Sequence, residues 1–287
     1  MASGMEITGK IQSIGNTMKV TSALDMVSAS KIRKSQDLMN ATRPYVRMMQ
    51  RISGHLSKAN PEIRHPFTVE YDTVEKVRYI IVSTDRGLCG GLNNNLFKKV
   101  MGDMMEWQNK DVGVNVVTFG KKAGAFFKNV NVELMGHVTG LGEQPQIEDL
   151  IGAVRIMLNA YRDNEIQRLF IVTNEFVNTM TQKPIIYQML PLPPTEDDEI
   201  RDIWDYIYEP DAQTLLDAVS VRYIEGVIYQ AVLENLASEH AARMLAMKNA
   251  TENAGELIDE LKLAYNKARQ AAITQEISEI VGGAAAV

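Results

Sequence analysis

The residues closest to a known chemical motif lie in a glycine-rich loop, "STDRGLCGGLNNNL", from Ser83 to Leu96. The loop follows the apolar run "VRYIIV", which predicts a buried strand, and precedes a helical pattern. Glycines at such a strand-to-helix turn can bring backbone N–H groups close to a phosphate. Nucleotide binding is therefore the first chemistry to test.

The spacing of the glycines argues against a nucleotide site. Gly87, Gly90 and Gly91 do not fit G-x-G-x-x-G, and the next predicted strand ends in "VTFGKK" without the acidic residue that holds a ribose. No G-x-x-x-x-G-K-[ST] motif is present in the sequence. We predict a tight connection between strand and helix, with Thr84 or Asp85 capping the helix that follows.

Other catalytic patterns are sparse. The four histidines are far apart and show no metal-ligand spacing, and no hydrolase or metalloprotease motif occurs. The single cysteine, Cys89, fits a structural thiol in a reducing compartment. No signal peptide or bilayer-spanning apolar run is recognised. We predict a cytoplasmic chain with no catalytic, cofactor-binding or metal-binding residues.

The charge is distributed unevenly along the chain. The net charge is −6, but residues 1–60 carry nine lysines and arginines against three acidic residues, a net charge of +6. The remaining residues therefore sum to −12. A basic segment on an acidic protein indicates either an anionic partner or a solvated helix face.

The middle of the chain alternates strand and helix patterns. Strand patterns are "VRYIIVS", "GVNVVTFG", "NVELMGHV", "RLFIVTNEF" and "PIIYQMLPL", and the first four are separated by segments with helical periodicity. The last two strands are too close for a crossover helix and should be antiparallel. We predict a Rossmann-like, mostly parallel α/β domain over residues 75–192.

Both ends of the chain read as long helices. In the first 58 residues, apolar positions step by four and three from Ile7, with a possible bend or break at Pro44. No proline occurs from Asp211 onward, and ~70 helical residues would extend roughly 105 Å. The predicted seam of this second helix consists of Met247, Ala250, Ala254, Leu257, Leu261, Ala264, Ala268 and Ala271.

We therefore predict four segments. Residues 1–58 form an N-terminal coiled-coil helix, 75–192 the inserted α/β domain, 193–210 an acidic connector, and 211–287 a C-terminal coiled-coil helix. The two terminal helices pair as an antiparallel, left-handed coiled coil, because their apolar positions repeat every 3.5 residues. The predicted fold class is α/β plus a long coiled coil.

Three segments carry a family resemblance. These are "IQSIGNTMKVTSALDMVSASKIRKSQ", "VSTDRGLCGGLNNNLFKK" and the stretch from "ENLASEHAARML" to "EISEIVGGAAAV". Together they resemble the gamma subunit of bacterial F-type ATP synthase over essentially the whole chain. The resemblance implies a central rotor shaft that couples proton flow to ATP synthesis or hydrolysis and has no active site of its own.

The resemblance also implies partners and a location. The coiled coil would lie inside a hexamer of alpha and beta subunits, and the globular foot would contact the c-subunit ring and the epsilon subunit. No nucleic acid or cofactor is implied. Membrane contact would occur only through the complex, at the cytoplasmic face of the bacterial inner membrane.

Functional residues follow from the resemblance by position. Those that would couple rotation to the beta subunits are Lys19, Leu24, Arg243, Arg269, Gln270, Thr274 and Glu276. The foot would include Tyr206 and Tyr208. Two other functions remain open from the residues alone, which are a nucleotide-dependent α/β enzyme dimerised by its coiled coil and a coiled-coil scaffold without a motor.

Overall fold

The computed structural model describes residues 4–59, 65–192, 209 and 211–285. Contacts between residues group the chain into two units. The sheet unit comprises residues 30–242, and the terminal-helix unit comprises residues 1–29 together with 243–287. The four segments predicted from the sequence divide the chain differently and stay a prediction. The predicted connector, 193–210, lies outside the described residues except for Glu209.

The sheet unit contains a five-stranded sheet in the order β3-β2-β1-β4-β5. Its strands are β1 (Lys76–Val82), β2 (Gly113–Phe119), β3 (Glu133–Val138), β4 (Arg168–Phe176) and β5 (Gln182–Leu190). The first four strands are parallel, and β5 pairs antiparallel with β4. Both the mostly parallel sheet and the closing hairpin confirm the prediction.

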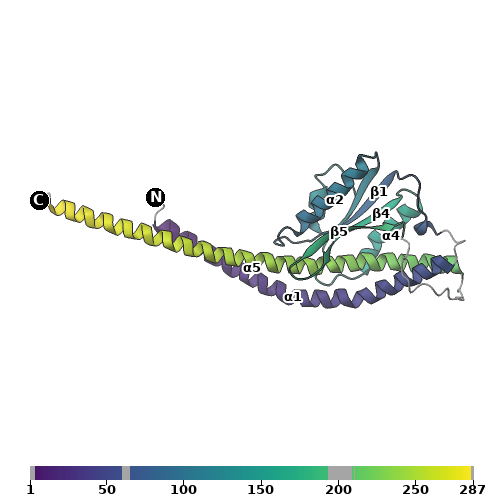
Figure 1. Ribbon diagram of the computed structural model, residues 1–287, viewed down its shortest axis with the longest axis horizontal. Helices are drawn as coiled ribbons and strands as arrows, with labels where there is room; N and C mark the ends of the chain where they lie inside the picture. The colour runs from purple at the N-terminus through teal and green to yellow at the C-terminus, as the bar shows by residue number, and fades with distance from the viewer. Residues whose placement is uncertain (1–3, 60–64, 193–208, 210, 286–287) are drawn as a thin grey trace. The chain divides into compact units, whose positions relative to one another are not determined.

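Helices cover both faces of this sheet (Figure 1). They are α2 (Leu92–Gln108), α3 (Lys121–Phe127), α4 (Glu148–Arg162) and part of α5 (Ala212–Ala285), with a short 3-10 turn, η1 (Pro66–Thr68). Alternate residues of β1 separate two apolar cores, because successive side chains of a strand point to opposite faces. Tyr79 and Ile81 pack with α2 and α3, whereas Ile80 and Val82 pack with α4 and α5.

The first helix, α1 (Gly4–Ala59), is continuous through Pro44. Proline cannot donate to the carbonyl four residues earlier, which here belongs to Asn40. Both residues are exposed, on the side of the helix that faces solvent. The apolar core residue Met39 and the half-buried Val46 lie on the opposite side of the helix. The proline therefore leaves the packed side of α1 unaffected, and the predicted break is absent.

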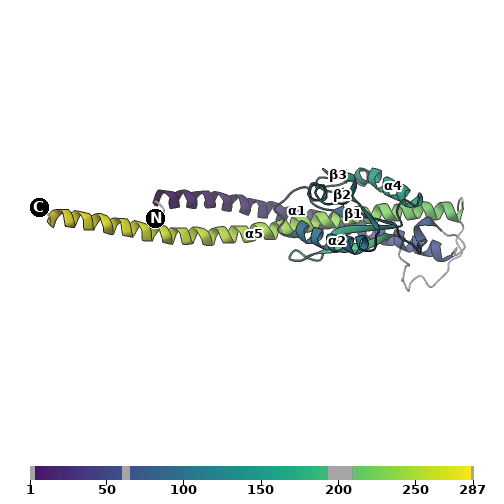
Figure 2. The ribbon, with the colours of Figure 1, turned by 90° about the horizontal axis from the view of Figure 1, so that it is seen from above.

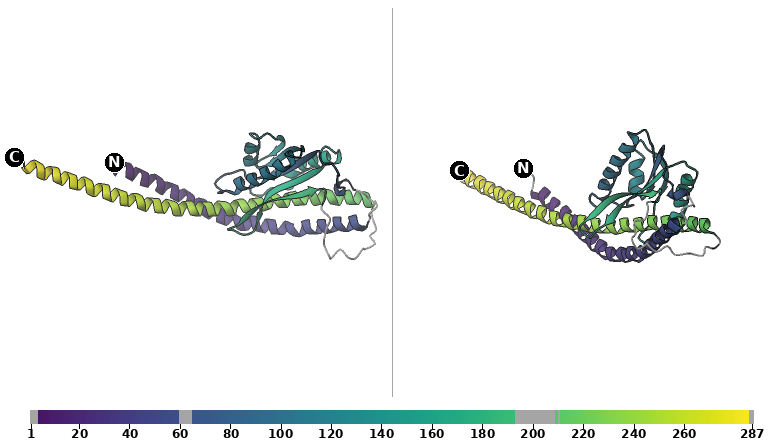
Figure 3. Two further views of the ribbon diagram at one scale, coloured as in Figure 1. Left: turned by 45° about the horizontal axis from the view of Figure 1, so that its top comes forward. Right: turned by 45° about the vertical axis from the view of Figure 1, so that its right-hand side comes forward.

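In the terminal-helix unit, the start of α1 packs against the C-terminal half of α5 (Figure 2; Figure 3). The hydroxyl oxygens of Thr21 and Thr251 are 2.7 Å apart. Positions of α1 buried or half-buried in the seam repeat by four and three: Ile7, Ile11, Ile14, Met18, Thr21, Asp25 and Ser28. The predicted heptad of α1 is confirmed. Along α5 the corresponding positions are Met247, Thr251, Ala254, Ile258, Leu261, Tyr265 and Ala268.

The predicted seam of α5 was therefore wrong at three of its eight positions. Leu257, Ala264 and Ala271 are exposed, whereas Ile258 and Tyr265, each one residue beyond a predicted position, are half-buried. A helix advances 100° per residue, so small alanines on the neighbouring face produce almost the same apolar spacing as the true seam. The periodicity of the sequence alone was compatible with two sets of α5 residues facing α1, which differ by one residue at alternate positions.

Candidate functional surfaces on the long helices and the glycine-rich loop

The glycine-rich loop satisfies its polar groups internally. The carboxylate of Asp85 accepts hydrogen bonds from the backbone N–H of Lys121 at 2.9 Å and from that of Gly140 at 2.9 Å. Asn93 donates its side-chain amide to the hydroxyl of Thr84 at 2.8 Å. The Asp85 carboxylate thus joins the glycine-rich loop to the first turn of the helix after β2.

The predicted cap is corrected in one respect. The residue that precedes α2 is Gly91, which has no side-chain hydrogen bond to the helix, and Asp85 instead caps α3. The carboxyl ends of β1 and β2 are adjacent because the strands are parallel partners. The loop after β1 therefore reaches the start of the helix after β2.

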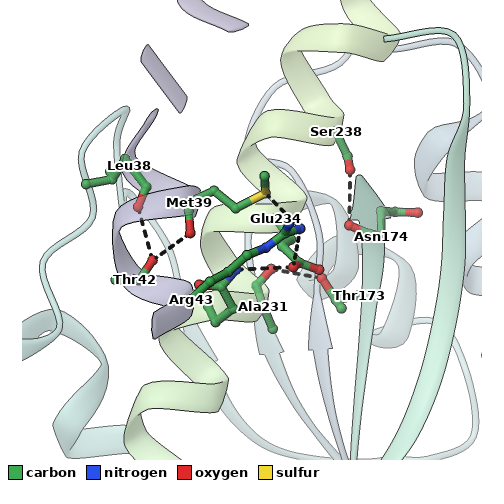
Figure 4. Close-up of polar contacts among 10 residues, drawn as sticks. Leu38, Met39, Thr42, Arg43, Thr173, Asn174, Ala231, Glu234 and Ser238 are labelled. Carbon is green, nitrogen blue, oxygen red and sulfur yellow. Dashed lines mark hydrogen bonds and ion pairs between the residues drawn. The ribbon is translucent and has the colours of Figure 1, made fainter. Parts of the chain in front are cut away.

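Helix α5 lies across the edge of the sheet that is formed by the carboxyl ends of the parallel strands. The order of strands reverses between β1 and β4, which is the place where open α/β sheets bind nucleotides. Here Thr173 and Asn174 at the end of β4 are buried and bonded to residues of α5, as Figure 4 shows. From the loop side, Cys89 and Leu92 pack on Ala242 of the same helix. Contacts from β4 and from the loop therefore hold α5 at this edge of the sheet.

The predicted beta-contact residues all belong to the terminal-helix unit. Lys19 is exposed and Leu24 half-buried on α1, whereas Arg243 on α5 is buried, with 8% of its surface exposed. The other four are exposed on α5: Arg269, Gln270, Thr274 and Glu276. Their role stays a prediction. The foot residues Tyr206 and Tyr208 lie outside the described residues.

These residues fall into two groups. Because Thr21 pairs with Thr251, an antiparallel partner for α5 ends near Ala268. Lys19 and Leu24 therefore lie on the paired part of the unit, and residues from Arg269 onward lie on α5 beyond the start of α1 (Figure 2). The two groups are therefore separated along the helices, and Arg243 lies on the paired part with the first.

The part of α5 beyond the start of α1 also carries a group of exposed apolar residues, of which only those in the terminal "EIVGGAAAV" were recognised from the sequence. They are Ile273, Ile277, Ile280 and Val281, each between 48% and 70% exposed. The first three step by four and three, so they share one face of the helix. The sequence shows the spacing of these residues. It does not show that the pairing with α1 ends before them. An exposed apolar stripe indicates a surface that another chain covers.

The described residues also limit other chemistry. No group of three histidine, cysteine, aspartate or glutamate side chains among them is arranged to hold a metal ion. No described helix contains an apolar window long enough to cross a bilayer.

Comparison with known sequences decides the family. A family profile described as ATP synthase matches residues 3–287. The ATP synthase gamma chain of Stenotrophomonas maltophilia (strain R551-3) is 57% identical over 287 residues, covering 100% of both chains. That of Xylella fastidiosa (strain M12) is 56% identical over 287 residues, again covering 100% of both. The chain belongs to the ATP synthase gamma chain family.

Solved structures in this family share the fold. The Tetrahymena thermophila mitochondrial ATP synthase central stalk with c-ring contains a chain with a TM-score of 0.61 and 18% identity, covering 80% of this chain and 99% of that one. A chain of the Euglena gracilis mitochondrial ATP synthase rotor has a TM-score of 0.60 and 19% identity, covering 94% and 98%. At these identities the likeness establishes the fold, and it confirms the predicted fold class.

Proposed function

We propose that this chain is the central rotor shaft of a proton-translocating F-type ATP synthase. The observation that carries the proposal is the match over the whole of both chains to proteins named ATP synthase gamma chain, at 57% identity. A shaft must be long and stiff, and α5 is one helix of 74 residues that pairs with α1 over the first part of its C-terminal half. The function couples proton flow through a membrane ring to ATP synthesis or hydrolysis.

The partners follow from the family and from the exposed surfaces. The alpha and beta subunits form the hexamer that surrounds the terminal helices, and the apolar stripe at Ile273, Ile277 and Ile280 contacts its inner wall. Lys19 and Leu24 form one coupling surface with the beta subunits, and Arg269 and Glu276 belong to another. The epsilon subunit and the c-ring bind the foot, to which Tyr206 and Tyr208 contribute. The complex lies at the cytoplasmic face of the bacterial inner membrane.

The chain contributes no active site of its own. The glycines of the loop lack the spacing of a phosphate-binding motif, and α5 covers the end of β4 at Thr173 and Asn174. These contacts favour the rotor over a free-standing nucleotide enzyme, because such an enzyme needs this edge of the sheet open. The adenine nucleotide sites belong to the other subunits of the complex.

Reconstitution tests the proposed function. The full chain is combined with the alpha, beta and epsilon subunits, and the purified complex is tested for ATP hydrolysis and, on membranes with the c-ring, for ATP-driven proton pumping. A chain that ends at Ala268 serves as the matched control, because it keeps the paired part of α5 and loses the exposed stripe. The proposal expects a pumping complex with the full chain and weaker assembly with the control. Failure of the full chain to assemble or to support pumping overturns it.

A further inference from the structure

The last residues of β4 have no strand on their inner side. β1 pairs with β4 from Arg168 to Val172 and then leaves the sheet as the glycine-rich loop. β4 continues to Phe176 and pairs there only with β5. Backbone groups on the side that β1 vacates need other partners, since a buried carbonyl without a hydrogen bond is costly. Helix α5 supplies one of them, because the Ser238 hydroxyl donates to the backbone carbonyl of Asn174.

Three buried hydrogen bonds join β4 to α5, as Figure 4 shows in part. The Thr173 hydroxyl donates to the backbone carbonyl of Ala231 at 2.9 Å, and the Asn174 side-chain amide donates to the side-chain oxygen Oδ1 of Asn235 at 2.9 Å. The Ser238 hydroxyl donates to the backbone carbonyl of Asn174 at 3.0 Å. The positions on α5 step by four and three, so the three bonds share one face of the helix.

A different side of α5 is held by α1 over the same stretch. Met39 of α1 packs against Leu233 and Ala237, and the guanidinium of Arg43 lies 3.3 Å from the Glu234 carboxylate (Figure 4). Helix α5 is therefore enclosed between β4 and α1. Between the described residues 38–43 of α1 and 229–237 of α5, the contacts are apolar packing and one partly exposed ion pair, whereas the contact with β4 includes three buried hydrogen bonds.

These two kinds of contact resist rotation differently. Apolar packing is non-directional, so a helix that turns about its own axis can exchange one apolar neighbour for another. A hydrogen bond weakens steeply away from its preferred angle. Turning α5 relative to the sheet would break all three bonds and leave buried polar groups without partners, each at a desolvation cost.

We propose that Thr173, Asn174 and Ser238 are positioning residues that fix the rotational register of α5 on the sheet and so transmit torque between them. The proposal rests on the proposed rotor function, in which force acts on the terminal part of α5 and the load acts through the sheet unit. Because α5 is one continuous helix, any slip between α5 and β4 loses coupling without affecting the chemistry in the other subunits.

The test uses the assembled complex on membranes that carry Thr173→Val together with Ser238→Ala. Valine keeps the shape of threonine, and the Ala231 carbonyl retains its intrahelical partner. ATP hydrolysis and ATP-driven proton pumping are measured on the same membranes. Hydrolysis is expected to persist while the ratio of pumping to hydrolysis falls about twofold or more, since two lost buried bonds change a conformational equilibrium by roughly tenfold.

The matched control is Thr42→Val. Thr42 is half-buried on α1 in the same region, but its hydroxyl bonds only to carbonyls of its own helix, those of Leu38 and Met39 (Figure 4). An unchanged ratio in the double variant overturns the proposal, and so does an equal fall in the control. If the double variant does not assemble, Thr173→Val and Ser238→Ala are measured singly by the same criterion. Absence of pumping with the unmodified chain would instead refute the rotor function itself.

Discussion

The carboxylate of Asp85, in the loop after β1, lies 2.9 Å from the backbone nitrogen of Lys121, in the first turn of α3. The same carboxylate accepts a bond from Gly140, after β3. One side chain therefore ties together the loops that follow three adjacent parallel strands.

Removing this carboxylate should destabilise the chain. Asp85→Ala leaves two backbone donors without their partner, and loss of a helix cap typically costs about 1–2 kcal/mol. Asp85→Asn keeps one acceptor oxygen and should cost less. The measurement is urea unfolding of the full-length chain. Asp163→Ala, at an exposed helix end, is the control and should stay within about 0.5 kcal/mol of the unmodified chain. Equal stability of Asp85→Ala would show that the link contributes nothing.

The isolated full-length chain should bind no ATP in calorimetry at micromolar concentrations. The physical reasons are that the glycines lack the spacing of a phosphate-binding loop and that α5 covers the end of β4, where an open sheet would bind a nucleotide. The control is the reconstituted complex, whose other subunits bind ATP. Micromolar binding to the isolated chain that Gly91→Ala abolishes would contradict this expectation and return the loop to consideration as a nucleotide site.

Two tryptophan substitutions distinguish the two registers of the seam. Ala254 is half-buried against α1, and Ala264 is exposed. Ala254→Trp should destabilise the pairing of α1 and α5, because overpacking a close contact costs about 1–3 kcal/mol. Ala264→Trp should have little effect on the isolated chain. Hydrogen exchange of the amides of α1 reports the pairing. The reverse order of effects would support the register predicted from the sequence.

A pH effect is expected at His65. Its side chain is buried, accepts from the N–H of Phe67 at 3.2 Å and bonds to Asp217 at 3.1 Å. Burial lowers the pKa of His65 below its ordinary value of 6.5, although Asp217 acts in the opposite direction. Below pH 6.5 the unfolded chain therefore binds a proton that the folded chain does not, and this contribution to stability is lost as pH falls towards the folded-state pKa.

The measurement is the free energy of unfolding of the full chain at about pH 8 and about pH 5.5, compared with His65→Gln. The variant should be less stable at the higher pH and should show a smaller loss on acidification. Other histidines contribute equally to both proteins and cancel in the comparison. A larger loss in the variant would mean that the pKa of His65 is raised rather than lowered.

Leu24→Lys should impair coupling more than hydrolysis. An exposed ion pair is worth about 0–1 kcal/mol, but a partly buried charge-assisted bond is worth about 1.5–3 kcal/mol and would favour one angle of rotation. Leu24 is half-buried on α1. Hydrolysis and proton pumping are measured on the same membranes, with Ala23→Lys on the neighbouring exposed position as the control. A common fall in both activities, or the same effect in the control, would remove Leu24 from the coupling surface.

Much of this fold could be predicted from the sequence because the signals are local. The five strands and the helices between them lie within a few residues of their predicted positions, since apolar runs and their periodicity are set by each segment's own burial. The heptad of α1 from Ile7 to Thr21 is confirmed for the same reason. The resemblance that three segments carried is confirmed by full-length matches to ATP synthase gamma chains.

Tertiary structure decided what depends on contacts distant in sequence. The helix that Asp85 caps, and the bonds from Thr173 and Asn174 to α5, join residues between 36 and 61 positions apart. The seam of α5 depended on which of two adjacent faces meets α1. These faces are 100° apart around the helix, and the alanine-rich sequence is compatible with both. The sequence alone determined which segments bury a face. Only packing against a particular neighbour determined which polar groups those faces had to satisfy, because a hydrogen bond requires a specific partner and direction.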